Sequence, residues 1–154
     1  MTVTSMSFYD GGALPAKNHH KKGNRSPDLA FHDVPEGTKS LALVCDDSDS
    51  PSGTWSLWVV WDIPPASKGL REGIPPLDTV PDTCHQGVND YGSTGWGGPC
   101  PPDGTGTHRY VFTLLALDMA VGPRKGLTKA ALLDTIGGHV LAEASITGRC
   151  SAEH

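Results

Sequence analysis

Residues 95–117 read Gly-Trp-Gly-Gly-Pro-Cys-Pro-Pro-Asp-Gly-Thr-Gly-Thr-His-Arg-Tyr-Val-Phe-Thr-Leu-Leu-Ala-Leu. Glycine permits backbone angles that other residues cannot adopt, and proline fixes its own angle, so the loop over 96–110 can be both shaped and stiff. The apolar residues that follow predict a strand over 108–117, with His108, Tyr110 and Phe112 on one face. A stiff loop that delivers a histidine and a tyrosine to the start of a strand is typical of a pocket wall.

The composition favours many turns between short strands. The 154 residues include 19 glycines and 13 prolines, which argues against a helix bundle. Compact apolar runs separate these turn formers, so the chain is not expected to be disordered. The length predicts a single domain over residues 1–154 with a sizeable core.

The net charge of −5 argues against nucleic-acid binding, which needs a basic face to neutralise phosphates. A basic cluster does occur, at His19, His20, Lys21, Lys22 and Arg25. It lies in a turn-rich stretch, and the simpler interpretation is a solvated loop.

Three further features bear on location and metals. No apolar run approaches 18 residues, so no membrane span is predicted. The first six residues show no secretory signal, which makes the cytoplasm the expected compartment. The four cysteines, Cys45, Cys84, Cys100 and Cys150, are then expected to be reduced. They have no CxxC spacing, which argues against structural zinc.

An acidic turn follows the predicted buried strand over 40–45. If the backbone stays extended there, Asp47 and Asp49 point the same way, roughly 6.5–7 Å apart. Carboxylates at the edge of a core must be hydrated, form an ion pair or take part in function, because a buried charge without compensation is costly. The alternative is that these aspartates make an Asx turn, and both interpretations stay open.

The clearest strand is predicted over 55–63, ahead of Pro64-Pro65. Alternation places Trp55, Leu57, Val59 and Trp61 on one face, with Trp58 and Val60 on the other. Both faces are apolar, so the strand belongs in the middle of a sheet, and its tryptophans are expected to be core residues.

The remaining elements are short. An extended segment is expected near 29–32, a helix from Thr128 as N-cap to Ile136, and a last strand over 144–150. Residues 66–95 show no strong periodicity, and a loop of this length is typically functional. These elements predict a mainly β domain with one or two short helices.

Three kinds of site can be built from these residues. A metal site would use Asp47, Asp49 and His108, but no metal-binding histidine motif occurs, and no metal is predicted. A hydrolytic site lacks a convincing nucleophile, because there is no G-x-S-x-G motif and Cys100 has no identifiable base. A pocket for a small anion or polar ligand fits best: loop N–H groups, His108 and Tyr110 donate, and a carboxylate accepts.

Several stretches together resemble the phosphatidylethanolamine-binding protein family, in particular its bacterial and archaeal kinase-inhibitor-like branch. The resemblance spans nearly the whole chain, and its two longest signatures have the family's order and spacing. The matching stretches are Asn24–Leu29 (N-x-S-P-x-L), Val34–Ser40 (V-P-x-G-T-x-S), Asp47–Pro51 (D-P-D-x-P, with serine for the first proline), Val59–Pro64, and Gly98–Tyr110 (G-P-x-P-P…G-x-H-R-Y).

The resemblance implies a sandwich of two antiparallel sheets with Greek-key connections and a pocket for phosphate-like groups, carboxylates or headgroups at one end. No cofactor is predicted. The ligand-binding residues that it implies are Asp47, Asp49, Trp55, Gly98, Pro101, His108 and Tyr110, with Leu57 at a further pocket position.

Leu57 departs from the family pattern, which carries a histidine there. Leucine cannot donate a hydrogen bond or carry positive charge. Binding of a dianionic phosphate is therefore expected to be weaker by about 1.5–3 kcal/mol, which is typical of a lost charge-assisted hydrogen bond. The pocket is expected to favour a more apolar ligand or to bind anions weakly.

Three functions follow, of which binding is favoured. The first is a soluble, non-catalytic protein that binds a small anionic or polar ligand. The second is an enzyme that has reused the pocket for a small organic substrate, with Asp47, Asp49 or His108 as general acid or base. The third is an interaction module that inhibits a kinase or protease. Whether the chain forms a homodimer is left open.

Overall fold

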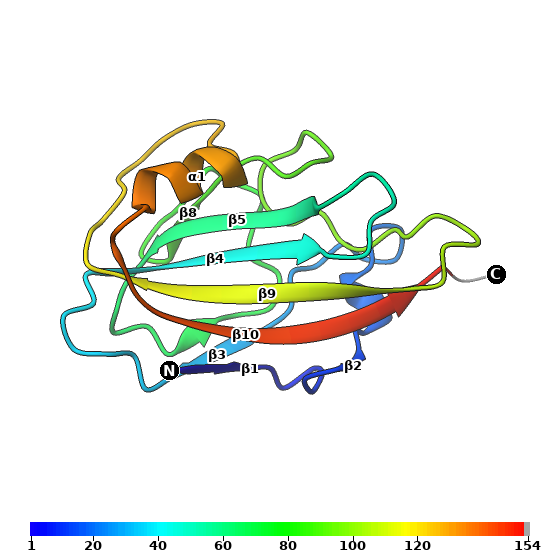
Figure 1. The fold of residues 1–154 in the computed structure, drawn as a ribbon, viewed down its shortest axis with the longest axis horizontal. Coiled ribbons are helices and arrows are strands. Elements are labelled where there is room, and N and C mark those ends of the chain that lie inside the picture. The colour runs from blue at the N-terminus through cyan, green and yellow to red at the C-terminus, as the bar shows by residue number, and fades with distance from the viewer. Residues whose placement is uncertain (153–154) are drawn as a thin grey trace.

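The computed structural model describes residues 1–152 and consists of two sheets, one α-helix (α1) and one 3-10 turn (η1) (Figure 1). The expected domain runs to residue 154, so its last two residues lie outside the described part. The elements are β1 (Thr2–Thr4), β2 (Gly12–Ala13), η1 (Ala16–Asn18), β3 (Leu29–His32), β4 (Ser40–Asp47), β5 (Trp55–Ile63), β6 (Gly69–Leu70), β7 (Thr79–Val80), β8 (Cys84–Gln86), β9 (Thr107–Leu117), α1 (Lys129–Ile136) and β10 (Val140–Ser151).

The strands form a small and a large sheet. The small sheet has the order β1-β3-β6, and the large sheet has the order β2-β10-β9-β4-β5-β8-β7. Within residues 1–152 every strand pair is antiparallel except β2 with β10. Strand β9 returns after a long connection to lie beside β4, which gives the spatial order β9-β4-β5-β8 of a Greek key. The predicted mainly β sandwich is confirmed.

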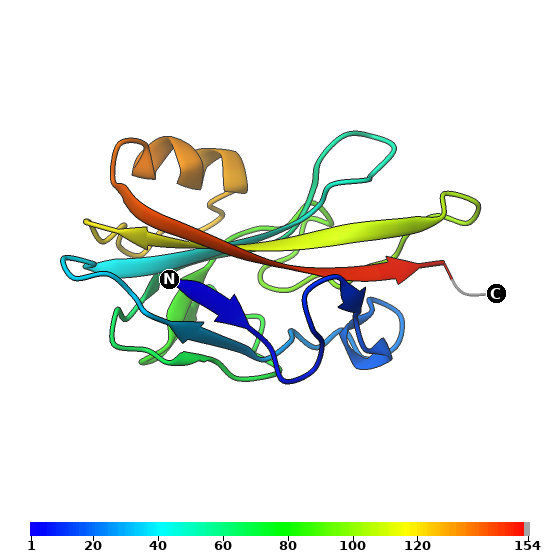
Figure 2. The ribbon, with the colours of Figure 1, turned by 60° about the horizontal axis from the view of Figure 1, so that its bottom comes forward.

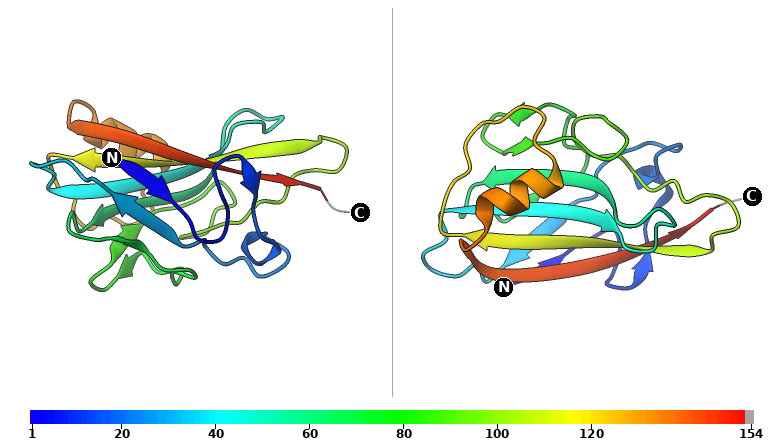
Figure 3. Two further views of the ribbon diagram at one scale, coloured as in Figure 1. Left: turned by 90° about the horizontal axis from the view of Figure 1, so that it is seen from below. Right: turned by 45° about the horizontal axis from the view of Figure 1, so that its top comes forward.

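The large sheet is covered on both faces (Figure 2). The small sheet packs on one face, and α1 packs on the other (Figure 3). This is why β4 and β5 consist of almost continuously apolar residues, since strands buried on both sides need no polar face. Helix α1 begins where predicted: the Thr128 hydroxyl accepts a hydrogen bond from the Ala131 N–H at 3.3 Å.

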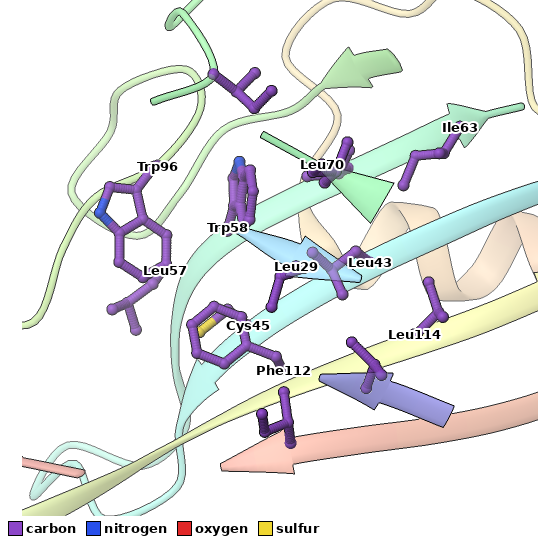
Figure 4. Close-up of a cluster of buried hydrophobic side chains, with 14 of the residues drawn as sticks. Leu29, Leu43, Cys45, Leu57, Trp58, Ile63, Leu70, Trp96, Phe112 and Leu114 are labelled. Carbon is purple, nitrogen blue, oxygen red and sulfur yellow. The ribbon is translucent and has the colours of Figure 1, made fainter. Parts of the chain in front are cut away.

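The core between the two sheets is filled by large side chains (Figure 4). Trp58, Phe112 and Leu43 have no exposed surface there, and Trp96 from the Gly/Pro loop stacks on Phe112 with 5.8 Å between ring centroids. The loop before β9 is therefore anchored in the core by its tryptophan.

The predicted faces of β5 are wrong at one point. Leu57 and the partly buried Trp55 pack in the same cluster as Trp58 and Val60. Val59 and Trp61 pack on the other face. The reason is a β-bulge: Cys45 of β4 pairs with Trp58, but the next residue, Asp46, pairs with Ser56, so Leu57 is the extra residue. The bulge turns Leu57 toward the end of the sandwich where β4 stops.

Asp46 and Asp47 point to opposite faces at that end. Asp46 forms an ion pair with Lys129 of α1. Burial nevertheless raises the pKa of Asp46 above its ordinary value, and the Lys129 ammonium offsets part of that effect. Asp47 points to the face that carries the small sheet, and it leads to the candidate site.

Candidate ligand-binding site

A cavity of about 370 Å³, called the first cavity below, opens where β4 ends. It lies between the turn after β4, the start of β5 and the Gly/Pro loop before β9. Most of its wall is apolar, and none of the residues that line it carries a positive charge. They are Asp47, Ser50, Pro51, Ser52, Trp55, Leu57, Tyr91, Cys100, Pro102 and Tyr110.

Strand register places three of these residues together. Asp47 is the last residue of β4, and its Cα pairs with Trp55 on β5 and with Tyr110 on β9. Strand β9 continues beyond the end of β4, and there it is paired with β10. His108 lies two residues before Tyr110 and therefore on the same face, beside the Asp47 carboxylate.

Asp47 and His108 form a buried pair. The Nδ1 of His108 lies 2.6 Å from Oδ2 of Asp47. His108 has no exposed surface, and Asp47 is 5% exposed. The Nε2 of His108 lies 2.8 Å from the Thr105 hydroxyl oxygen. Both ring nitrogens are thus occupied, and His108 lies behind Asp47 and outside the residues that line the first cavity.

The hydrogen bonds of Thr105 define the protons in this pair. The Thr105 hydroxyl donates its one proton to the carbonyl oxygen of Pro102 at 2.6 Å, so it can only accept from His108. Nε2 of His108 must therefore carry a proton. A second proton lies between Nδ1 and Oδ2, whether it belongs to the imidazolium or to the carboxyl group. In either arrangement the Asp47–His108 pair has no net charge.

Two tyrosines add hydroxyl groups to this end of the sandwich. The Tyr110 hydroxyl is buried and makes no hydrogen bond of standard geometry within the described residues, although the Asp47 carboxylate lies near enough to act on it. Burial, followed by the nearby Asp47 charge, raises the pKa of Tyr110 well above its ordinary value. Burial raises the pKa of Tyr91 to about 12, and its hydroxyl donates to the carbonyl of Gly98 at 2.7 Å. Both hydroxyls keep their protons at neutral pH, so Tyr110 can donate to a ligand.

Aromatic rings form one side of the cavity. Trp55 meets Tyr91 edge to face, with 5.3 Å between centroids, and Tyr91 stacks on His20 at 4.4 Å. The loop that carries Tyr91 is fixed by hydrogen bonds of the two preceding residues. The carboxylate of Asp90 accepts from the Ser56 N–H at 2.7 Å. The Asn89 side chain accepts from the Tyr91 N–H at 3.0 Å.

Asp49 does not point into the first cavity beside Asp47. The backbone turns at this point, and the Asp49 N–H donates to Oδ1 of Asp47 at 2.9 Å, as in an Asx turn. Its carboxylate accepts from the Arg109 guanidinium at 2.8 and 2.9 Å and from the Arg109 N–H. These hydrogen bonds lower the pKa of Asp49 to about 2. The extended alternative is therefore wrong, and Asp49 holds the turn against β9.

The other expected site residues divide between two cavities. Trp55, Leu57 and Tyr110 line the first cavity. Gly98 does not, and Pro101 lines a second cavity of about 280 Å³, which shares Cys100 with the first. The residues that line this second cavity are His19, Lys21, Lys22, Pro99, Cys100, Pro101, Asp103, Cys150, Ser151 and Ala152.

Gly98 supports the site from outside. A Cβ atom at this position would lie 2.1 Å from the carbonyl oxygen of Asn18, and the Gly98 N–H donates to the Asn24 side chain at 2.7 Å. Only glycine lets the loop before β9 approach the segment after η1 this closely.

We therefore expect Gly98→Ala to lower the free energy of unfolding by about 1–3 kcal/mol, as an overpacked site does. Urea unfolding measures the change. Gly137→Ala is the matched control, because Gly137 has φ of −54° and its Cβ would meet nothing closer than 3.5 Å. An equal effect of the two substitutions would contradict the assigned role of Gly98.

Sequence reasoning missed several residues of the first cavity. Tyr91 arrives on the long connection between β8 and β9, where only an aromatic among turn formers marks it. Pro102 and the turn at 50–52 are not among the predicted site residues, and Cys100 is considered as a nucleophile and not as a pocket wall. Their side chains reach the cavity because loops on both sides of it close over the end of the sheet.

Within residues 1–152 no three side chains of His, Cys, Asp or Glu are placed to hold a metal ion together. No helix in the same range has the length and apolarity to cross a membrane.

Comparisons with known proteins agree with this architecture. The model of the phosphatidylethanolamine-binding protein family matches residues 4–151. A UPF0098 protein of Methanothermobacter thermautotrophicus is 44% identical over 148 residues, which is 96% of this chain and 97% of that relative. The chain therefore belongs to the phosphatidylethanolamine-binding protein family, as its signatures predict.

Two crystal structures match over nearly the full length. YbcL of Escherichia coli has a TM-score of 0.90 and 32% identity, covering 99% of this chain and 98% of its own. The homologue CT736 of Chlamydia trachomatis has a TM-score of 0.89 and 35% identity, covering 99% and 97%. These relatives come from an archaeon and from bacteria, which confirms the chain as a member of the bacterial and archaeal part of the family.

Proposed function

We propose that this protein binds a small organic molecule in the first cavity and does not transform it. The observation that carries the proposal is the cavity itself: about 370 Å³ with aromatic and aliphatic walls and the buried Tyr110 hydroxyl, which makes no hydrogen bond of standard geometry among the described residues. A buried hydroxyl without a partner is costly unless a ligand or water accepts from it. The ligand would have an apolar body and one polar group that reaches Tyr110 and Asp47.

The charge of the site bears on which polar group fits. The family is named for binding a phospholipid, phosphatidylethanolamine. In this chain Leu57 stands where the family resemblance implies a histidine, and none of the lining residues carries a positive charge. The Asp47–His108 pair is neutral as a unit. The first cavity therefore favours a hydroxyl, amide or similar neutral group over a dianionic phosphate.

A catalytic role has weaker support. A general base must reach the proton that it abstracts. His108 is fully buried with both ring nitrogens hydrogen-bonded, and Asp49 is engaged with Arg109. Asp47 faces the cavity, but its carboxylate is committed to His108 and to the Asp49 N–H.

Benzyl alcohol is a suitable first probe, because it combines one ring with one hydroxyl. We expect millimolar binding, the range for a compound of this size, with chemical-shift changes at residues 47–57 and at the Trp55 indole N–H in an NMR titration. Trp55→Ala is expected to weaken binding about fivefold to tenfold through loss of the aromatic wall.

The matched control is Tyr9→Ala. Tyr9 is an aromatic residue that is 78% exposed and does not line the cavity, so its loss should leave the affinity unchanged. A folded wild-type protein that shows no shift at residues 47–57 with saturating benzyl alcohol would refute the proposed function.

A further inference from the structure

The basic segment after η1 has a defined position in the structure. Lys17, which lies in η1 itself, and Arg25 at the far end of the segment both pair with Glu72, at 2.6 and 3.5 Å. Lys21 and Lys22 form no ion pair within the described residues, and both line the second cavity. Within residues 1–152, the two lysines of the segment that form no ion pair are thus the two that line the second cavity.

The backbone of this segment is held in place. The carbonyl of His19 accepts from the N–H groups of Lys22, Gly23 and Asn24, at 2.9–3.3 Å. The His20 N–H donates to the carbonyl of Pro99 at 3.0 Å. The loop that carries Lys21 and Lys22 is therefore fixed against the Gly/Pro loop, which forms the wall of both cavities.

The charge inside the second cavity is positive but small. His19 donates from Nε2 to the carbonyl of Leu14 at 3.0 Å. Asp103 is the one carboxylate among the lining residues, against Lys21 and Lys22. An anion that enters would meet two ammonium groups, which suits a single carboxylate or phosphate.

The two cavities are neighbours that share Cys100 as a lining residue. Pro101 lines the second cavity and Pro102 lines the first, so consecutive residues of one stiff loop face both. The first cavity is apolar with a neutral polar end, whereas the second is lined by Lys21 and Lys22. One ligand that extends past Cys100 would meet both environments.

We propose that the second cavity binds the anionic group of an amphiphilic ligand whose apolar part occupies the first cavity. The ligand class is a compound with a ring or short chain and a terminal carboxylate or phosphate. The proposal rests on the proposed function, because it needs the first cavity to hold the apolar part.

The test compares a neutral probe with its anionic counterpart. The probes are 3-phenylpropan-1-ol, its phosphate ester and 4-phenylbutyrate, and binding is followed by NMR titration at low and high salt. We expect each anion to bind the wild-type protein at least about fivefold more tightly than the alcohol at low salt, from attraction to the two ammonium groups. The phosphate and carboxylate arms show which anion is preferred.

Two variants locate the effect. Lys21→Gln/Lys22→Gln is expected to remove most of the anion's advantage and leave the affinity for the alcohol unchanged. Lys68→Gln/Lys125→Gln is the matched control, because it removes two exposed lysines outside both cavities with the same change in net charge. This control should keep the advantage.

The outcomes separate the two proposals. If the alcohol binds but neither anion binds more tightly, the second cavity has no role and the proposed function stands. The same conclusion follows if the advantage survives in Lys21→Gln/Lys22→Gln. If the alcohol fails to bind the folded wild-type protein, the proposed function is wrong, and the amphiphile proposal falls with it.

Discussion

Replacing His108 with leucine is expected to lower the free energy of unfolding by about 3–5 kcal/mol, as happens when one partner of a buried ion pair is removed. Leucine has a similar volume, so the loss measures the polar pair more than a cavity. The substitution would leave the carboxylate of Asp47, which is 5% exposed, without its buried partner. In the wild-type protein a proton lies between Oδ2 of Asp47 and Nδ1 of His108.

Urea unfolding measures this loss, and a neighbouring ion pair supplies the control. Arg109→Ala breaks the Asp49–Arg109 contact, in which the Arg109 side chain is 63% exposed, and should cost no more than about 1 kcal/mol. Asp47→Leu/His108→Leu should recover part of the stability, because it leaves no unpaired charge. A loss in His108→Leu as small as that in Arg109→Ala would contradict the buried pair.

Leu57→His is expected to raise the affinity of the first cavity for inorganic phosphate by about tenfold or more, the equivalent of one charge-assisted hydrogen bond. Leu57 lines the cavity and has no exposed surface, so a histidine there would face the ligand. The gain should be larger at pH 6 than at pH 8, because an ordinary histidine is protonated only below about pH 6.5.

NMR titration with phosphate measures this effect through the shifts of Trp55 and Tyr110, which report on the first cavity and not on the second. Leu133→His is the matched control, since Leu133 is 41% exposed and lies on α1. Equal phosphate affinity in Leu57→His and in the wild-type protein would show that Leu57 is not what limits anion binding.

Much of the fold could be predicted because its long strands are long apolar runs. Strand β5 covers Trp55–Ile63, as the sequence predicts, and β9 covers Thr107–Leu117, one residue more than predicted. Strand β10 is longer than predicted, Val140–Ser151, because its first half is exposed and alternates weakly. Exposed strand residues leave little apolar pattern in a sequence.

The error at β5 has a physical cause. Period-two alternation assigns faces only while the strand stays regular, and Leu57-Trp58-Val59-Val60-Trp61 is apolar throughout. Nothing in such a run marks an extra residue, so the bulge at Leu57 becomes visible only in the pairing with β4. That same bulge brings Leu57 to the cavity.

The position of the site could be predicted because it lies where the end of β4 meets the start of β9. Asp47 and Tyr110 pair directly across β4 and β9, so the end of one apolar run and the start of the other locate the cavity. Tyr91 and Lys21 arrive on loops held by scattered hydrogen bonds, such as Tyr91 N–H to Asn89. Contacts of that kind have no period and cannot be inferred from spacing.

A crystal structure with 4-bromobenzyl alcohol would test ligand binding in the first cavity most directly, because anomalous scattering locates the bromine without interpretation of weak density. We predict a bromine peak among Trp55, Leu57 and Tyr110, with the alcohol oxygen within hydrogen-bond distance of the Tyr110 hydroxyl. Bromine peaks confined to the outer surface, with an empty first cavity at saturating ligand, would contradict the assignment.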